Sequence, residues 1–250
     1  MDLLTRTGGY TIRLADGAEV EAAQRLRHEV FAGELGANLR TGIPGHDVDE
    51  FDAYCDHLIV RDDATGAVVG TYRMLPPGRT DRRYGDTEFD LTALDPLRDV
   101  LVEAGRSCVH PDHRTGAVIN LMWSGIARYL HLHGRRWLGG CASIALDDGG
   151  ATAAAVWERV RDKHLAPPRL RVRPRQPWPL VPATRNAPTP PLLRGYLRLG
   201  AWVCGEPAYD PDFGCADLYV LLSTDRIDPR YRRHFFGDST LGDLPLGDLP

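Results

Sequence analysis

The stretch from Val102 to His133 constrains the fold most, because its pattern changes from strand to helix within a few residues. Val102 to His110 is typical of a strand, Pro111 to Gly116 is a tight polar turn, and Ala117 to His133 predicts a long apolar helix. A strand that enters a helix through such a turn brings backbone N–H groups and the positive helix end to one point. We expect this point to bind the phosphate end of a cofactor or carrier arm. The turn residues concerned are Arg114, Thr115 and Gly116.

The composition is that of a globular protein with a sizeable core: 43% of the 250 residues are hydrophobic and 26% are charged. The net charge of −4 argues against general nucleic-acid binding. The five cysteines are scattered and form no C-x-x-C pair, so we expect neither a disulfide framework nor a metal site. No apolar leader or membrane-length run stands out, which favours a cytoplasmic protein that is either free or peripheral on the inner face of the membrane.

The order of the remaining elements predicts an α/β or α+β fold with a mixed sheet flanked by helices. We expect one domain over residues 1–238 and a disordered tail over 239–250, where LGDLP occurs twice. The expected strands are Tyr10–Leu14, His57–Arg61, Ala67–Leu75, Trp137–Ile144 and Ala216–Ser223. The expected helical segments are Ala18–Leu35, part of Phe89–Leu101, Thr152–His164, the start of Leu192–Cys204 and Pro229–Phe236.

Four charged side chains lie where apolar neighbours are expected. Arg27 falls on the apolar stripe of its helix, pointing inward or extending off the edge of the stripe, and Arg73 shares a strand face with Val69. Glu103 and Arg106 are three apart on one strand, so regular alternation would send them to opposite faces. A bulge at Gly105 would turn both toward one cleft and separate this strand from its neighbour, leaving backbone groups for an extended amide-bearing arm.

Two loops carry a high density of one charge. The loop 36–56 contains Asp47, Asp49 and Asp52 beside Phe51, which is either a solvated acidic loop or a subsite for an ammonium group. The proline-rich stretch 166–191 reads as an insertion. Its arginines at every second position would project to one side, either into solvent or toward an acidic protein or anionic membrane. They are Arg169, Arg171, Arg173 and Arg175.

Several short motifs, taken in order, resemble one branch of the GNAT-type N-acyltransferases, the ornithine N-acyltransferases that make lyso-ornithine lipid. The resemblance spans about Ile12 to Phe236 and extends more distantly to the acyl-homoserine-lactone synthases. The motifs are Arg27-x-x-Val30-Phe31, Asp47-x-Asp49-x-Phe51-Asp52, His57-Leu58-Ile59-Val60, Val69-Gly70-Thr71-Tyr72-Arg73, Glu103-x-Gly105-Arg106-Ser107-Cys108-Val109-His110-Pro111, Gly140-Cys141-Ala142-Ser143 and Arg194-Gly195-Tyr196-Leu197-Arg198-Leu199-Gly200-Ala201.

This resemblance implies a GNAT fold with a splayed sheet and no resident cofactor. It implies acyl-phosphopantetheine on acyl carrier protein as the donor, in preference to acyl-CoA, and an amino acid as the acceptor. The turn Arg114-Thr115-Gly116 is one residue shorter than the usual pyrophosphate-binding turn of acetyl-CoA-using relatives and has fewer glycines. A carrier arm, which ends in a single phosphate, fits such a turn better.

The reaction then suggests roles for the residues that match. Glu103 is the expected base, with Arg106 beside it, and a backbone N–H near Cys108 or Val109 is expected to hold the oxyanion. An arginine among Arg27, Arg73 and Arg106 is expected to bind the acceptor carboxylate. The acids Asp47, Asp49 and Asp52 are expected to bind its second ammonium. Phe31 completes the expected acceptor site, and Cys108, Val109, His110, Arg114, Thr115 and Gly116 form the expected donor site.

Alternatives remain open at this stage. Glu103 could serve only to orient a buried arginine, and Cys108 could be an acyl-enzyme nucleophile beside His110, although we favour a packing role for it. The acceptor could instead be lysine, glycine, tyrosine or a homoserine derivative. The protein could also be a non-catalytic module that binds acyl carrier protein or acyl lipid.

Overall fold

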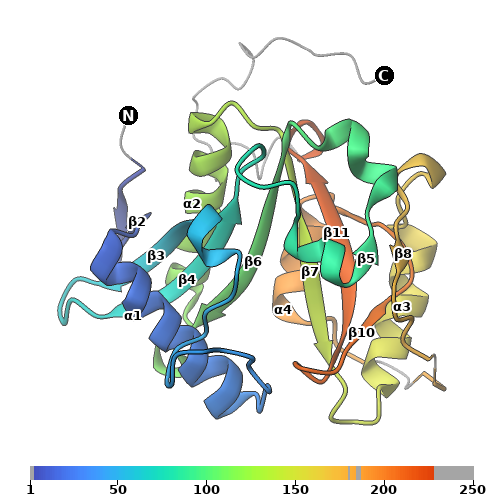
Figure 1. Cartoon of the computed structure of the whole chain (residues 1–250), viewed down its shortest axis with the longest axis horizontal. Helices are drawn as coiled ribbons and strands as arrows, with labels where there is room; N and C mark the ends of the chain where they lie inside the picture. Colours follow the sequence, from blue (N-terminus) through green and yellow to red (C-terminus); the bar gives the residue numbers. More distant parts are fainter. Residues whose placement is uncertain (1–2, 180, 184–186, 228–250) are drawn as a thin grey trace.

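The computed structural model describes residues 3–179, 181–183 and 187–227. The tail 239–250, the helical segment expected at Pro229–Phe236 and the boundary at residue 238 lie outside these residues, so they stay predictions. Most of the described chain builds one mixed sheet with helices on both faces (Figure 1). The predicted fold class is confirmed.

The main sheet runs continuously through both halves of the described chain. In spatial order its strands are β1 (Thr5–Thr7), β2 (Tyr10–Leu14), β3 (Asp56–Asp62), β4 (Val68–Leu75), β6 (Leu101–Val109), β7 (Trp137–Ala145), β11 (Cys215–Ser223) and β10 (Ala208–Asp210), and β9 (Trp202–Val203) pairs with β11. Neighbouring strands are antiparallel except β6 and β7, which are parallel and are joined by the crossover helix α2 (Gly116–Leu132). This crossover is the strand–turn–helix unit that the sequence predicts.

One face of the sheet packs on three helices, α2, α3 (Ala151–Lys163) and α4 (Pro191–Arg198). Their buried side chains belong to one core with the inward residues of the strands. Helix α2 begins where Thr115 accepts a hydrogen bond from the Val118 N–H at 3.4 Å, and its apolar stripe is buried along its whole length. The length of that stripe is what made α2 predictable.

The opposite face is covered by two separate units (Figure 1). Helix α1 (Gly17–His28) lies over β3, β4 and β6, and a π-helical turn, Glu29–Glu34, follows it. The predicted helix Ala18–Leu35 therefore changes its hydrogen-bonding pattern after His28. A second unit covers β7 and β11. It contains β5 (Phe89–Asp90), β8 (Arg173–Pro174) and the 3₁₀-helix Thr92–Leu97.

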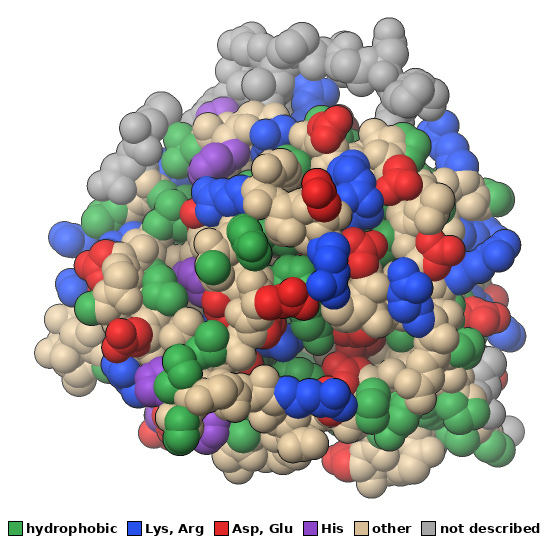
Figure 2. All heavy atoms as spheres, in the orientation of Figure 1, with side chains coloured by type: hydrophobic (Ala, Val, Ile, Leu, Met, Phe, Trp, Pro, Cys, Tyr) green, Lys and Arg blue, Asp and Glu red, His purple; other side chains and the backbone are tan. Residues whose placement is uncertain are grey.

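The proline-rich stretch belongs partly to this second unit. Leu170, Val172 and Trp178 are buried, and β8 pairs with β5. The four alternating arginines between and beside them are all exposed, so the predicted alternation is correct and the segment is a packed part of the fold. Figure 2 shows Lys and Arg side chains, with acidic groups among them, on the right-hand side, where Figure 1 places α3 and β8.

Candidate active site

The two central parallel strands separate soon after they meet (Figure 1). β6 pairs with β7 from Leu101↔Trp137 to Glu103↔Gly139, and no further register pair joins them among the described residues. Gly140 sits at the point of separation, where a Cβ atom would lie 2.1 Å from the Ala104 carbonyl oxygen. Beyond this point a cavity of about 970 Å³ opens between the strands. The splayed pair that the sequence predicts is therefore present.

A β-bulge lies on the other edge of β6, one residue beyond its predicted position. Gly105 pairs with Arg73 and Cys108 with Thr71, so Tyr72 alone faces the two residues between them, Arg106 and Ser107. Arg106 takes up the distortion with a φ of 50°, a left-handed conformation that is strained for a residue with a side chain. As a result Glu103 and Arg106 both line the cavity, as expected, but Gly105 itself pairs regularly.

Glu103 is held by backbone donors. Its carboxylate accepts hydrogen bonds from the N–H groups of Tyr84, at 2.6 Å, and Gly85, at 3.0 Å. The side chain is 5% exposed, and burial raises the pKa of its carboxyl group to about 7 against the opposing effect of these two donors. No ion pair within 4.0 Å joins Glu103 to an arginine in the described part of the chain. Glu103 and Arg106 thus line the same cavity without forming an ion pair with each other.

The expected acceptor residues form a compact ionic network. Arg27 is fully buried, and its Nε donates to Asp47 at 2.9 Å while one terminal nitrogen donates to both carboxylate oxygens of Asp52, at 2.8 and 2.9 Å. Arg73 donates to Asp49 at 2.6 Å, and Arg106 lies 3.2 Å from both Asp49 and Asp47. The inward direction of Arg27 is confirmed.

This network balances three arginines against three aspartates. Arg73 and Arg106 reach the wall of this cavity, whereas Asp47 and Asp49 line an adjoining cavity of about 670 Å³. Each of the three aspartates has an arginine partner, and their contact with an ammonium group stays a prediction. The aromatic rings of Tyr84 and Phe213 pack on the guanidinium group of Arg106, with its central carbon 4.6 and 4.9 Å from the ring centres.

Phe31 also lines the cavity and helps to close its open end. Its ring contacts that of Phe213 with centroids 5.5 Å apart, and Phe213 belongs to the loop between β10 and β11. The Asn38 N–H donates to the Asp212 carbonyl at 2.7 Å, and Arg40 lies 2.9 Å from the Asp212 carboxylate. These contacts connect the loop after α1 with the far half of the sheet, across the separated ends of β6 and β7.

The expected donor site lies at the end of β6 and the start of α2. The N–H of His110 donates to Val69 on β4 at 2.8 Å, so strand alternation directs the N–H of Val109 to the opposite, open edge. Cys108 pairs with Thr71, which directs its N–H toward β4. Of the two residues expected to provide the oxyanion contact, Val109 is the one whose N–H points away from β4, and neither residue lines the 970 Å³ cavity.

The side chains of this donor region have other partners. Burial raises the pKa of the Cys108 thiol to about 12, and the side chain packs with Leu26 and Val30, which suits a packing role rather than a nucleophile. His110 lies 3.4 Å from Glu29. Arg114 donates through both terminal nitrogens to Glu34, at 2.6 and 2.5 Å, and through Nε to the Val109 carbonyl at 3.0 Å.

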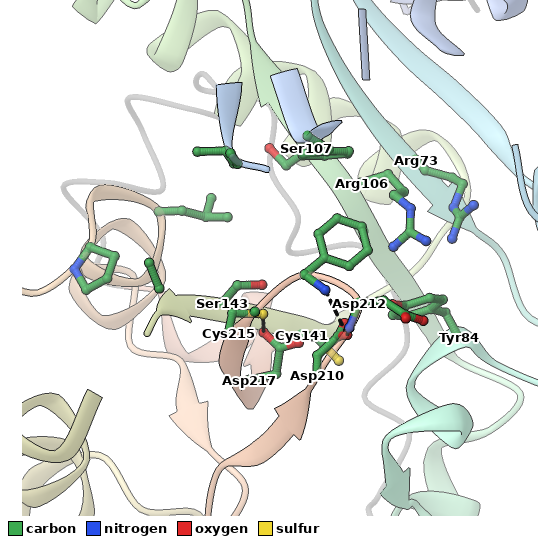
Figure 3. Close-up of a pocket in the computed structure, with 18 of the residues that line it drawn as sticks. Arg73, Tyr84, Arg106, Ser107, Cys141, Ser143, Asp210, Asp212, Cys215 and Asp217 are labelled. Carbon is green, nitrogen blue, oxygen red and sulfur yellow. Dashed lines mark hydrogen bonds between the residues drawn. The ribbon is translucent and has the colours of Figure 1, made fainter. Parts of the chain in front are cut away.

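Sequence reasoning did not identify three features of the site. Tyr84 and Gly85, which hold Glu103, lie in a segment that reads as a polar turn, and Phe213 lies in a segment without a clear pattern. Across the cavity from Arg73 and Arg106, Figure 3 shows Asp210 and Asp217, which no motif indicated. The only sequence feature that points to these two acids is that Asp217 interrupts an otherwise apolar strand.

Comparison with known proteins agrees with this fold and shows the family of the chain. Residues 26–124 match the family model of an acetyltransferase (GNAT) domain. The chain is 37% identical to L-ornithine N(alpha)-acyltransferase of Rhodobacter capsulatus over 90% of this chain and 94% of that protein. It is 34% identical to the protein of the same name from Brucella abortus, over 93% and 91% of the two chains. The chain belongs to the L-ornithine N(alpha)-acyltransferase family.

More distant members of the fold are acyl-transferring enzymes as well. The AHL synthase LasI superimposes with a TM-score of 0.54 at 13% identity over 92% of this chain and 96% of that one. FeeM, an N-acyl amino acid synthase from uncultured soil microbes, gives a TM-score of 0.54 at 11% identity, covering 86% and 92%. At these identities the likeness concerns the fold alone.

Membership of this family makes the protein an acyltransferase enzyme rather than a binding module. Among its described helices, none combines the length and the apolar character needed to cross a membrane.

Proposed function

We propose that this acyltransferase moves a fatty acyl chain, 3-hydroxylated in the physiological donor, from acyl carrier protein to the α-amine of ornithine and so forms lyso-ornithine lipid. The observation that carries the proposal is the splayed β6–β7 pair with Glu103 on its wall, in a chain whose relatives bear the name of this acceptor. The open strand edges offer backbone partners to the amide groups of a phosphopantetheine arm.

The turn at the start of α2 favours a carrier-bound donor over acyl-CoA. Arg114 uses both terminal nitrogens on Glu34 and its Nε on Val109, so it has little capacity left for additional phosphates. The N-terminal end of α2, at Thr115 and Gly116, remains as a site for one phosphate. A carrier arm brings one phosphate to this place, whereas CoA brings a pyrophosphate and a further phosphate.

In the proposed reaction the α-amine of ornithine gives a proton to Glu103, directly or through water, as its nitrogen bonds to the thioester carbon. The resulting oxyanion accepts a hydrogen bond from the N–H of Val109. When the intermediate collapses, the C–S bond breaks and the thiolate of the carrier arm leaves, taking up a proton. A carboxyl pKa of about 7 suits Glu103 for this role, because about half of the groups are then ionised at neutral pH and the carboxylate is basic enough to take the proton.

A matrix of donors and acceptors tests the proposal. The purified enzyme is incubated with acyl carrier thioester or acyl-CoA of equal chain length, and with ornithine, lysine, glycine, tyrosine or homoserine lactone, and products are identified by mass spectrometry. We expect Nα-acyl-ornithine from the carrier thioester at the highest kcat/KM. A higher kcat/KM with acyl-CoA would refute the donor assignment alone, and turnover of another amine but not ornithine would refute the acceptor assignment.

The same protein produced in a host that lacks ornithine lipids should lead to lyso-ornithine lipid in the lipid extract. Catalytically impaired Glu103→Gln protein is the matched control, since it should give no such lipid at comparable protein levels.

A further inference from the structure

A cluster of acids occupies the wall of the cavity that faces the arginine network (Figure 3). Asp210 ends β10, and Asp217 lies on β11. They are 8% and 2% exposed. Glu88 joins them from the covering unit, just before β5. Asp217 lines the main cavity, Glu88 lines an adjoining cavity of about 670 Å³, and Asp210 lines both, so the cluster forms the wall between the two spaces.

These acids differ from Asp47, Asp49 and Asp52 in having no basic partner. No ion pair involves Glu88, Asp210 or Asp217 in the part of the chain that the structure describes. Both carboxylate oxygens of Glu88 are buried, and neither has a hydrogen-bond donor among these residues. Asp217 is contacted by the Cys215 thiol, at 3.6 Å, and by the Ser143 side chain, neither of which is a cation. Asp210 accepts the N–H groups of Asp212, at 2.9 Å, and Phe213, at 3.1 Å.

The buried acids Glu88 and Asp217 are difficult to ionise without a cation beside them. Burial raises the pKa of Glu88 well above its ordinary value, and the negative charge of Asp217 and then of Asp210 raises it further. Burial also raises the pKa of Asp217. Buried carboxyl groups without a cation share protons, because like charges at short distance cannot all ionise. A bound cation reverses this and stabilises the ionised forms.

We propose that Glu88, Asp210 and Asp217 form the subsite that holds the side-chain ammonium of a diamino-acid acceptor. This inference rests on the proposed function, whose acceptor carries one amine to be acylated and one to be left intact. A primary ammonium group has three N–H donors and matches several converging carboxylates. Held there, the side-chain amine stays protonated and cannot attack the thioester.

The position of the acid cluster relative to Glu103 suits a substrate with one amine at the cluster and the other near Glu103. Cys141 lies between the two groups on β7, because Glu103 pairs with Gly139 and Asp217 pairs with Ser143, and residues two apart on a strand share a face. One end of a short diamino acid can therefore contact the acid cluster while the other end lies near Glu103. The subsite thus favours acylation of the α-amine over the side-chain amine.

The test compares L-ornithine with L-norvaline, which has a side chain of the same carbon length without the ammonium group. In the native enzyme kcat/KM should favour ornithine strongly. In Glu88→Gln and Asp217→Asn this preference should fall by about 10-fold or more, the range expected for loss of a hydrogen bond to a charged group. Norvaline turnover should change little, and the share of product acylated on the side-chain amine should rise. Asp147→Asn, which removes an exposed carboxylate at the rim of the same cavity, is the matched control and should keep the preference.

The outcomes separate the two proposals. If the native enzyme does not acylate ornithine, the proposed function fails. If it acylates ornithine but both variants keep the native preference and product position, the ammonium subsite alone is refuted. Thermal unfolding of each variant shows whether it is folded. One carboxylate oxygen each of Asp210 and Asp217 and the Cys215 sulfur lie within 4.8 Å of one another, so a divalent metal is the competing occupant. Metal analysis that finds one tightly bound ion per chain, lost in Asp217→Asn, would overturn the ammonium assignment.

Discussion

Glu103 combines burial with two backbone donors, and its pKa of about 7 leads to a prediction about the rate. The carboxylate is the basic form, so kcat should rise with pH in a step at about 7 and rise further toward the pKa of the amine. Glu103→Gln should lower kcat by about 10²- to 10⁴-fold and remove this step, leaving a rise only toward the amine's own pKa of about 8 or higher. Steady-state kinetics from pH 5.5 to 9.5 measure both effects.

Glu103→Asp is the control for the presence of a carboxylate, and it should keep part of the activity with a step in the profile. A Glu103→Gln enzyme within twofold of the native rate would show that Glu103 is not the base.

Arg27 is fully buried between Asp47 and Asp52, so its removal leaves an excess of buried negative charge, with Arg106 at 3.2 Å from Asp47 and Arg73 at 3.5 Å from Asp52 as the remaining arginines. Arg27→Met should lower the free energy of unfolding by about 3–5 kcal/mol, measured by urea denaturation. Arg40→Met removes an arginine of another Arg–Asp pair, whose arginine is 78% exposed, and should cost less than about 1 kcal/mol. Equal effects of the two substitutions would contradict this account.

For single residues, sequence patterns predicted which charged side chains are buried but not which residues they contact. Helix and strand periodicity placed Arg27 and Arg73 inside. Their partners come from a loop without periodicity, so the pairing of Asp47, Asp49 and Asp52 with arginines was not predictable. Glu88, Asp210 and Asp217 escaped notice for the same reason, because three separate segments bring them together.

The strands β6 and β7 show which structural features the sequence pattern of a strand or helix predicts and which it does not. The parallel crossover was predictable because a strand, a turn and a long apolar helix follow one another. The bulge was predicted from Gly105, since glycine is the residue most tolerant of distorted backbone. The distortion lies instead at Arg106, where the side chain is fixed by Asp47, Asp49 and two aromatic rings. Short strands such as β5, β8 and β10 have too few residues to show alternation.

Gly140 provides a test of how the separation of β6 and β7 is built. A methyl group there would meet the Ala104 carbonyl at 2.1 Å, so Gly140→Ala should force the strands apart where they last pair. We expect a loss of about 1–3 kcal/mol in the free energy of unfolding, as in other overpacked sites. Thermal and urea unfolding measure it. Gly105→Ala is the matched control, because no atom lies within 4 Å of the added methyl group, and it should unfold like the native protein. Indistinguishable variants would argue against close approach at Gly140.

On the scale of the whole molecule, the exposed arginines of the proline-rich stretch extend along one side of the unit that covers β7 and β11. We predict that replacing Arg169, Arg171, Arg173 and Arg175 by glutamine weakens association with acidic carrier protein or with anionic vesicles and flattens its dependence on salt. Binding measured at several ionic strengths tests this. Fold should be kept, since the apolar residues between these arginines provide the packing. Unchanged binding to both would leave the arginines as solvated surface.

The cavity is bounded very differently at its two ends. At one end three register pairs of backbone, Leu101↔Trp137 to Glu103↔Gly139, join the two halves of the sheet. At the other end the halves meet through Phe31 and Phe213, Asn38 and Asp212, and the exposed Arg40. We therefore expect the width of the opening to vary more easily near the loops than beside Glu103. Under the proposed function, acyl chains of different bulk would then change the loop end of the cavity and not the geometry around Glu103.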